Sequence, residues 1–346
     1  MLGYLVTFII ALIASYLLTP LIRRVAIEFK IMDKPSSSEI KTHLVATPYL
    51  GGVAIYFSFV IALFLATIFL HLSWEDIYIV LISGTIIMFM GLIDDISSLS
   101  VYLRFIIQIV IAFVLILFNI RIMFISPSYI GMFLTVLWVV GITNAFNIID
   151  IMDGLSAGVA VIASMALLFI ALPTEQIYVN FAAAALAGST LGFLKYNFFL
   201  RKDKKALIFM GDAGSLFIGF ILAALSMGTS YTKMNDIALF SPLLILGIPI
   251  YDTFFVMLLR FKQGKPIFHG SRDHVALRLE VLGFNRKQVV LIIYGVSALL
   301  SLVALLLTNV KINWAIYIYL FVGAVSVIGA VKLGKIKMEE KNNNVH

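Results

Sequence analysis

Hydrophobic residues fill most of the chain in long runs, and short polar segments separate these runs. Each of about eleven runs approaches the ~20 residues that an α-helix needs to cross a bilayer. The runs cover residues 3–22, 49–70, 77–93, 102–120, 129–147, 157–173, 176–194, 211–229, 237–259, 288–307 and 313–332. The pattern predicts an all-α, polytopic integral membrane protein with about eleven transmembrane helices in a single domain, residues 1–346.

The composition supports a membrane protein. Of the 346 residues, 62% are hydrophobic and 12% are charged, whereas a soluble domain carries about 25% charged residues. The absence of cysteine excludes disulfides and cysteine-based metal sites. The run that begins at Leu2 has no basic segment before it and no small-residue cleavage site after it. We therefore expect it to be the first span and not a removed signal peptide.

The distribution of basic residues predicts the orientation. If the N-terminus is outside, 22 of the 25 Lys and Arg fall on the inner side, and only Arg121, Lys233 and Lys311 fall outside. Cytoplasmic loops carry such an excess, so we expect the C-terminus in the cytoplasm. The net charge of +7 then forms a basic face beside anionic lipid of the inner (cytoplasmic) membrane. No nucleic-acid-binding module accompanies it, so we expect no nucleic-acid partner.

The expected cytoplasmic loops are residues 23–48, 94–104, 148–156, 195–210 and 260–287. Six aspartates lie in these loops or near the inner ends of the spans: Asp94, Asp95, Asp150, Asp153, Asp212 and Asp252. An acid at the centre of a membrane helix costs roughly 2.5–3.5 kcal/mol, so intramembrane acids usually mark a function. Their convergence at the inner face predicts a polar site there.

The densest polar stretch runs from Asn144 to Asp153. On a helix, Asn147, Asp150 and Asp153 would recur every three residues and project from nearly one side. A lone acid of this kind could be a helix cap. Two amides and two carboxylates within ten residues instead indicate a site for a cation or a polar substrate.

Two further acidic motifs suit a divalent cation. Asp94 and Asp95 are adjacent, and burying both without a cation would raise one pKa sharply. Two hydrated acids at the membrane interface are the alternative. Asp212 lies between two glycines at the start of a span, where a plain helix start is the alternative. Oxygen ligands without cysteine favour Mg²⁺, with Mn²⁺ as the second option.

Basic clusters in two inner loops suit phosphate contact. Lys41 and His43 precede a Thr-Pro turn and a Gly-Gly pair, and residues 260–287 include Arg272, His274 and Arg278. Ordinary positive-inside residues are the alternative for each of these cations. The role of Asp252 stays open at this stage.

Four motifs in order carry a family resemblance. They are Thr47-Pro-x-x-Gly-Gly, Asp94-Asp95, Asn144-x-x-Asn147-x-x-Asp150-x-x-Asp153-Gly-Leu and Phe209-Met-Gly-Asp212-x-Gly-Ser. From about Lys41 to Phe284 the chain resembles the polyprenyl-phosphate N-acetylhexosamine-1-phosphate transferases. That family includes the GlcNAc-1-phosphate transferases of the WecA type and the phospho-MurNAc-pentapeptide transferases of peptidoglycan synthesis.

The resemblance implies transfer of a sugar-1-phosphate from a UDP-sugar to a membrane polyprenyl phosphate, such as undecaprenyl phosphate. UMP would be released, and the product would start a cell-wall, lipopolysaccharide or teichoic acid glycan. The spacing of Lys41 and His43 favours UDP-GlcNAc over the pentapeptide donor. The active site would face the cytoplasm. Whether the protein forms a homodimer is left open by the sequence.

The resemblance also implies roles for individual residues. Its catalytic residues would be Asp94, Asp95, Asp150 and Asp153, and its magnesium ligands Asp212 and Asp95. Its substrate-binding residues would be Lys41, His43, Asn144, Asn147, Phe209, Arg272, His274 and Arg278, with Phe209 stacked on uracil. Phosphoryl transfer needs charge neutralisation and positioning more than covalent chemistry, which agrees with this residue set.

The sequence departs from the family pattern at two motifs. Ile151 stands where a glycine is usual, and only His274 remains of a motif with three histidines. These departures keep open a relative without catalysis. The pentapeptide transferase is another alternative, and an ion-coupled transporter is one of a different class. Transporter carboxylates, however, typically lie near the membrane midplane and often accompany an internal repeat, which this chain lacks.

Overall fold

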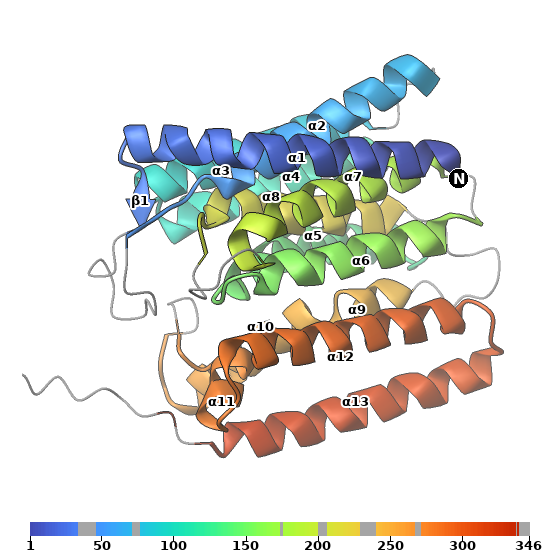
Figure 1. Cartoon of the computed structure of the whole chain (residues 1–346). Helices are drawn as coiled ribbons and strands as arrows, with labels where there is room; N and C mark the ends of the chain where they lie inside the picture. Colours follow the sequence, from blue (N-terminus) through green and yellow to red (C-terminus); the bar gives the residue numbers. More distant parts are fainter. Residues whose placement is uncertain are drawn as a thin grey trace, which may run out of the picture.

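The computed structural model of the chain describes residues 1–33, 46–70, 77–173, 176–199, 206–228, 240–266, 271–336 and 338. Figure 1 shows a bundle of roughly parallel and antiparallel helices, with two short strands at one end. The long helices are α1 (Leu2–Glu28), α2 (Gly51–Leu70), α3 (Tyr78–Ile96), α4 (Val101–Leu117), α5 (Ser128–Ile148), α6 (Leu155–Ala171), α7 (Ile177–Leu194), α8 (Gly211–Gly228), α10 (Gly247–Lys262), α12 (Arg286–Leu307) and α13 (Ile312–Gly334).

Short elements connect these helices. They are β1 (Met32–Asp33), β2 (Thr47–Pro48), the π-helix η2 (Lys195–Phe199), α9 (Ser241–Ile245) and α11 (Val275–Val281). The strands pair antiparallel, with Met32 opposite Pro48. In Figure 1 the N-terminus and the C-terminal end of α13 lie at opposite ends of the bundle.

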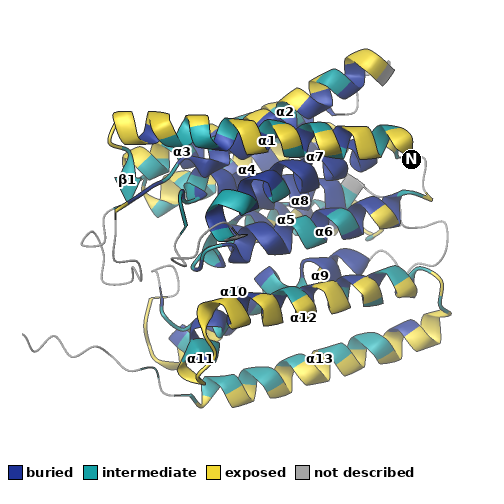
Figure 2. Cartoon of the chain, in the orientation of Figure 1, coloured by how far each residue is buried: buried dark blue, intermediate teal, exposed yellow. Residues whose placement is uncertain are grey.

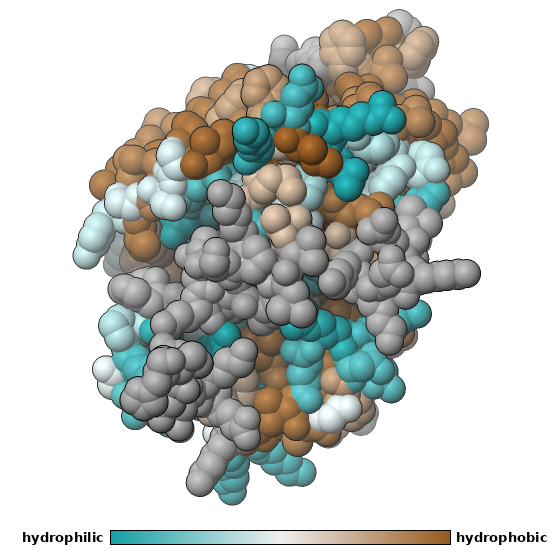
Figure 3. Space-filling model, turned by 60° about the vertical axis from the view of Figure 1, so that its left-hand side comes forward, coloured by the Kyte–Doolittle hydropathy of each residue, from teal (hydrophilic) through white to brown (hydrophobic). Residues whose placement is uncertain are grey.

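The helices confirm the predicted class, an all-α membrane protein. Among the described residues, seven helices are long and apolar enough to cross a membrane, and α4, α6 and α8 are shorter apolar helices. Figure 3 shows hydrophilic residues gathered towards the bundle end that carries β1 and α11, beside broad hydrophobic sides. The count of eleven spans and the predicted orientation stay predictions.

The predicted span at residues 237–259 is two helices in the part that the structure describes. Helix α9 ends at Ile245, and α10 begins at Gly247. Pro249 lacks a backbone N–H and therefore cannot donate to the carbonyl oxygen of Ile245, which interrupts the helical ladder. Hydropathy alone does not detect this break, because both pieces are apolar.

Burial falls from the centre of the bundle to its edge (Figure 2). In the most apolar window of the span formed by α7 and η2, 83% of residues are buried, whereas the matching window of α13 is 6% buried. Helix α7 lies at the centre of the bundle because its small residues allow neighbouring helices to pack closely against it. A Cβ at Gly188 would lie 2.2 Å from the carbonyl oxygen of Phe8, so the glycine permits close contact with α1. The core therefore lies around α6, α7 and α8, and the polar residues described next lie at its end.

Candidate active site

The end of α3 and the start of α8 are joined by a carboxylate cap. Asp95 Oδ1 accepts from the backbone N–H of Asp212 at 2.8 Å, and its Oδ2 accepts from that of Ala213 at 3.0 Å. The first N–H groups of a helix lack intrahelical partners, and a carboxylate is favoured there. Gly91 allows this approach, because a Cβ would lie 2.5 Å from the carbonyl oxygen of Asp212.

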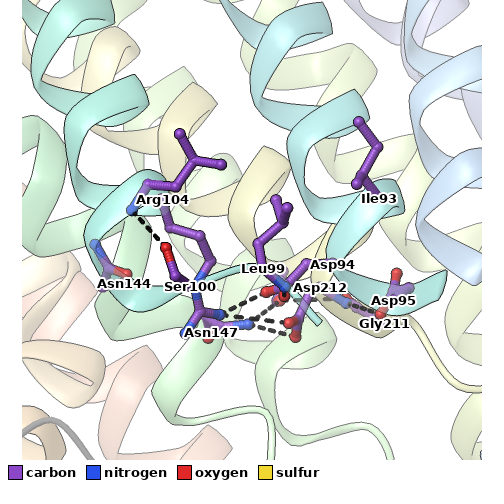
Figure 4. Close-up of polar contacts among 12 residues, drawn as sticks. Ile93, Asp94, Asp95, Leu99, Ser100, Arg104, Asn144, Asn147, Gly211 and Asp212 are labelled. Carbon is purple, nitrogen blue, oxygen red and sulfur yellow. Dashed lines mark hydrogen bonds and ion pairs between the residues drawn. The ribbon is translucent and has the colours of Figure 1, made fainter. Parts of the chain in front are cut away.

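A cation lies beside two of the predicted acids (Figure 4). NH1 of Arg104, at the start of α4, donates to Asp94 Oδ2 at 2.6 Å and lies 3.6 Å from Asp212 Oδ2. The Asp94 side chain is only 6% exposed, whereas that of Asp212 is 36% exposed. Arg104 thus offsets the buried charge of Asp94, and the Asp212 side chain stays partly exposed.

The end of α5 supplies the neighbouring amides. Asn147 Nδ2 donates to Asp212 Oδ1 at 2.7 Å and to Ser215 Oγ at 3.0 Å. One turn earlier, Asn144 Nδ2 donates to Gln108 Oε1 and to the carbonyl oxygen of Val140. Both amides are therefore oriented by protein contacts. Of the three residues expected on one side of a helix, only Asn147 lies on it, because α5 ends at Ile148 and Asp150 and Asp153 follow in a loop.

The acidic loop, which we define as residues 150–154, follows α5. Asp153 Oδ2 accepts from the backbone N–H of Ala206 at 3.1 Å. Removal from bulk water raises the pKa of Asp150 to about 8, and the charges of Asp212 and Asp153 act in the same direction. In the absence of a cation, Asp150 is therefore mainly protonated at neutral pH.

Backbone pairing fixes the position of Phe209. Its N–H donates to the carbonyl oxygen of Pro48 at 2.8 Å, and its carbonyl oxygen accepts from Gly51 N at 3.0 Å. Gly52 N donates to Met210 O at 2.8 Å. The Thr-Pro-x-x-Gly-Gly motif thus pairs with the segment that carries Phe209 and leads into α8. Lys41 and His43, the phosphate contacts predicted in the segment before this motif, lie outside the described residues.

The role of Asp252 becomes clear in the structure. Its Oδ2 lies 2.7 Å from Nδ1 of His274, and its Oδ1 accepts from the N–H of Val275 at 2.8 Å. Asp252 and His274 are both buried. A carboxylate beside Nδ1 holds the proton on that nitrogen in the neutral ring, which leaves Nε2 as an acceptor.

The two arginines predicted to bind substrate in this region, Arg272 and Arg278, are not among the residues that line the cavity, whereas His274 is. Arg278 is buried, and its NH1 donates to the carbonyl oxygens of Leu333 and Ile336 beside the end of α13. Its NH2 donates to Asp273 Oδ1 at 2.6 Å. Arg278 therefore ties the end of α13 to the α11 region, a contact that the sequence did not predict. Arg272 is half-buried. Substrate contact by either arginine stays a prediction.

A cavity of about 1490 Å³ opens beside these groups. Arg104, Asn144, Asn147 and His274 line one end of it. The rest is lined mainly by apolar residues, along α5 and α10 and as far as Phe240 at the opposite end of the bundle. A long apolar cavity with a polar end suits an amphiphilic molecule with a chain and an ionic head.

Comparison with known proteins decides the family. Residues 77–230 match the model of glycosyl transferase family 4. Over 327 residues the chain is 33% identical to a Bacillus subtilis (strain 168) protein named probable undecaprenyl-phosphate N-acetylglucosaminyl 1-phosphate transferase. That match covers 92% of this chain and 88% of the relative. The chain belongs to glycosyl transferase family 4.

More distant relatives of this family 4 protein carry related names. It is 31% identical over 319 residues to the decaprenyl-phosphate N-acetylglucosaminephosphotransferase of Mycobacterium tuberculosis H37Rv, covering 82% of this chain and 77% of that protein. It is 28% identical over 310 residues to the undecaprenyl-phosphate alpha-N-acetylglucosaminyl 1-phosphate transferase of Escherichia coli K12, covering 85% and 82%. These matches confirm the resemblance found in the motifs, and the family 4 protein is a glycosyl-1-phosphate transferase.

The structure adds two residues that the sequence did not single out in this family 4 site. Arg104 looked like an ordinary cytoplasmic cation, although it is the single basic residue in the loop 94–104. Gln108 lies one helical turn later and is fully buried, with its Oε1 bonded to Asn144. The sequence did contain a signal for both residues: Gln108 is a polar residue inside an apolar span, four positions after the lone Arg104.

Proposed function

We propose that the protein transfers N-acetylglucosamine-1-phosphate from UDP-GlcNAc to a membrane polyprenyl phosphate, with undecaprenyl phosphate as the expected acceptor. The observation that carries the proposal is the cavity of about 1490 Å³, whose polar end includes Asn147, the hydrogen-bond donor to Asp212, and whose remainder is mainly apolar. The names of the relatives support the sugar and the acceptor. We place the site at the cytoplasmic face of the inner membrane, with eleven spans and an external N-terminus.

The acceptor would place its hydrocarbon chain in the apolar part of the cavity and its phosphate at the polar end. Arg104 would meet the phosphate there, because its side chain is 23% exposed and lines the cavity. Asn147 lines the same end. A guanidinium presents several N–H donors in a fixed plane and therefore suits a phosphate.

The donor would lie on the opposite side of Asp212, between the acidic loop and the segment that carries Phe209. Bonds between neighbouring segments fix both parts: Asp153 accepts from Ala206, three residues before Phe209. Phe209 would stack on uracil, and Asp150 and Asp153 would contact polar groups of the nucleotide. Lys41 and His43 would meet the donor phosphates. His274, which lines the cavity, would offer Nε2 to the acceptor phosphate.

The site fits a magnesium ion that is held largely by substrate. Among the residues that the structure describes, no three His, Asp or Glu side chains form a metal cluster. Mg²⁺ commonly takes only one or two protein carboxylates and completes its shell with water and substrate phosphates. Asp212 is our principal ligand, with Asp95 as the second candidate. When bound, the ion would neutralise charge on the donor diphosphate.

The remaining chemistry follows from positioning. An oxygen of the acceptor phosphate attacks the phosphorus next to the sugar, the bond to the UMP phosphate breaks, and UMP leaves with that bond's electron pair. The lipid then carries a diphosphate-sugar. The attacking oxygen is already anionic at neutral pH, so no proton has to be removed. Arg104 holds the acceptor in line.

A direct assay tests this function. Purified protein, Mg²⁺ and undecaprenyl phosphate are incubated with UDP-GlcNAc, UDP-GalNAc or UDP-MurNAc-pentapeptide, and UMP is measured. We expect release from UDP-GlcNAc only. Asp212→Asn should abolish release while the thermal unfolding temperature stays close to that of the wild type. Release from the pentapeptide donor alone, or from none of the donors by folded protein, would contradict the proposal.

A further inference from the structure

The backbone of Gly154 is held by two side chains from different parts of the chain. Its N–H donates to Asn197 Oδ1 at 2.6 Å, and its carbonyl oxygen accepts from the hydroxyl of Tyr294. Asn197 belongs to the π-helix η2 and Tyr294 to α12. Gly154 is the last residue of the acidic loop and the N-cap of α6.

Two glycines make these contacts feasible. Gly154 has a φ of +80°, which an L side chain rarely adopts. At Gly158, one turn into α6, a Cβ would lie 1.9 Å from the Tyr294 hydroxyl oxygen. The ring of Tyr294 also meets that of Phe198 edge to face, at 6.2 Å between centroids. The hydroxyl therefore reaches Gly154 through a gap that α6 leaves for it.

The same contacts connect the two parts of the proposed donor site. The side chain of Asn197 donates from Nδ2 to the carbonyl oxygen of Ile208 at 3.0 Å. Ile208 directly precedes Phe209, and Gly154 directly follows Asp153. A shift of Gly154 would therefore move the acidic loop relative to the segment that carries Phe209.

Helix α12 brings Tyr294 to this place from outside the matched family region, residues 77–230. None of the motifs that carry the resemblance includes Tyr294, and its apolar surroundings in the sequence resemble any other span. The hydroxyl nonetheless ends on a backbone oxygen of the acidic loop. A partly buried hydroxyl on such a helix needs a hydrogen-bond partner, and here the partner is the carbonyl oxygen of Gly154 at the site.

We propose that Tyr294 is a positioning residue for donor binding: its hydroxyl holds Gly154, and thereby Asp150 and Asp153, in the geometry that the nucleotide-sugar requires. This inference rests on the proposed function for its kinetic consequence. Tyr294 does not touch substrate in this account. It acts through the backbone of Gly154.

The test compares two changes of Tyr to Phe. Tyr294→Phe removes the bond to Gly154 and keeps the ring. Tyr251→Phe is the matched control, because the Tyr251 hydroxyl also donates to a backbone carbonyl of another helix, that of Ser326 in α13. For Tyr294→Phe we expect the KM for UDP-GlcNAc to rise about 3- to 10-fold, the range that loss of one hydrogen bond gives. The KM for undecaprenyl phosphate and kcat should change less than about twofold, and Tyr251→Phe should leave all three unchanged.

Hydrogen–deuterium exchange supplies a readout that does not depend on activity. Amides of residues 150–158 should exchange faster in Tyr294→Phe than in the wild type or in Tyr251→Phe. Unchanged exchange would overturn the inference, whether or not the wild type transfers sugar phosphate. An inactive wild type would instead contradict the proposed function and leave the exchange test in place. If the wild type is active, two kinetic results for Tyr294→Phe would also overturn the inference: an unchanged KM for UDP-GlcNAc, or an equal rise in the KM of both substrates.

Discussion

Asp95 accepts a hydrogen bond from the backbone N–H of Asp212, across the contact between α3 and α8. The sequence predicts that both aspartates belong to one site, and this hydrogen bond joins them directly. Asp95 uses both oxygens as the cap of α8, and Asp212 Oδ2 lies 3.6 Å from NH1 of Arg104. The metal-ligand role of Asp95 stays a prediction, whereas its capping role follows directly from the geometry.

Loss of this cap should lower both stability and activity. Asp95→Ala leaves two buried N–H groups of α8 without an acceptor, and loss of an N-cap typically costs about 1–2 kcal/mol. The start of α8 would also loosen, so Asp212 would be misplaced and transfer should fall strongly. Thermal unfolding and UMP release measure the two effects. Asn285→Ala is the control, because Asn285 caps α12 in a capping box at the surface.

The control separates capping from catalysis. Asn285→Ala should lower the unfolding temperature by a comparable amount and leave transfer unchanged. If Asp95→Ala kept wild-type transfer despite the lower stability, the cap would not position Asp212, and this interpretation would be wrong.

Arg104 should matter for the acceptor. Arg104→Gln removes the cation beside Asp94, whose side chain is only 6% exposed, and also removes the donor that we assign to the acceptor phosphate. We expect the KM for undecaprenyl phosphate to rise at least about tenfold, because charged hydrogen bonds contribute more than neutral ones. Arg286→Gln breaks a surface pair with Glu280 and should leave kinetics unchanged. Equal kinetics in the two variants would refute the role of Arg104.

Asp252 and His274 should act as a unit. Asp252 holds Nδ1 of His274, and His274 lines the cavity, so either Asp252→Asn or His274→Ala disturbs the imidazole ring at the cavity wall. Each single variant should raise the KM for undecaprenyl phosphate, because His274 lines the cavity that we assign to the acceptor. The double variant should be little worse than His274→Ala. Steady-state kinetics on the three variants measure this coupling. Fully additive losses would show that the two side chains act independently.

The metal-free protein should lose stability as the pH rises. The pKa of Asp150 is raised to about 8 in the folded chain, whereas an unfolded Asp titrates near pH 3.9. Between these values the folded state holds a proton that the unfolded state has released, so a higher pH favours unfolding. In EDTA, the unfolding temperature of the wild type should fall between about pH 5 and pH 8, and Asp150→Asn should reduce that fall. The same slope in both proteins would contradict the assignment.

Much of the architecture was accessible from the sequence because apolar runs of membrane length leave few options. In the part of the chain that the structure describes, the runs correspond to long helices, but the break between Ile245 and Gly247 was missed. The motif residues could be singled out from the sequence, since acids and amides are rare in apolar spans, and their roles stay predictions. Asp94, Asn147 and Asp212 do meet in space, although they come from three different helices.

The partners of these residues were not accessible, because they depend on which helices pack together. Arg104 resembled any cytoplasmic cation until its distance to Asp94 was known. Arg278 resembled a phosphate ligand, and the structure places it on the carbonyl oxygens beside the end of α13. The positions of Gly91 and Gly158 likewise acquire meaning only through the groups that approach them, Asp212 and Tyr294.

The most direct test of the account follows the phosphate and the sugar together. UDP-GlcNAc carrying radioactive phosphorus next to the sugar is incubated with purified protein, Mg²⁺ and undecaprenyl phosphate, and the lipid is extracted. We predict that the label enters the lipid in a one-to-one ratio with N-acetylglucosamine and with the UMP released. Label that stays in the aqueous nucleotide while the sugar or nothing reaches the lipid would contradict transfer of a sugar-1-phosphate.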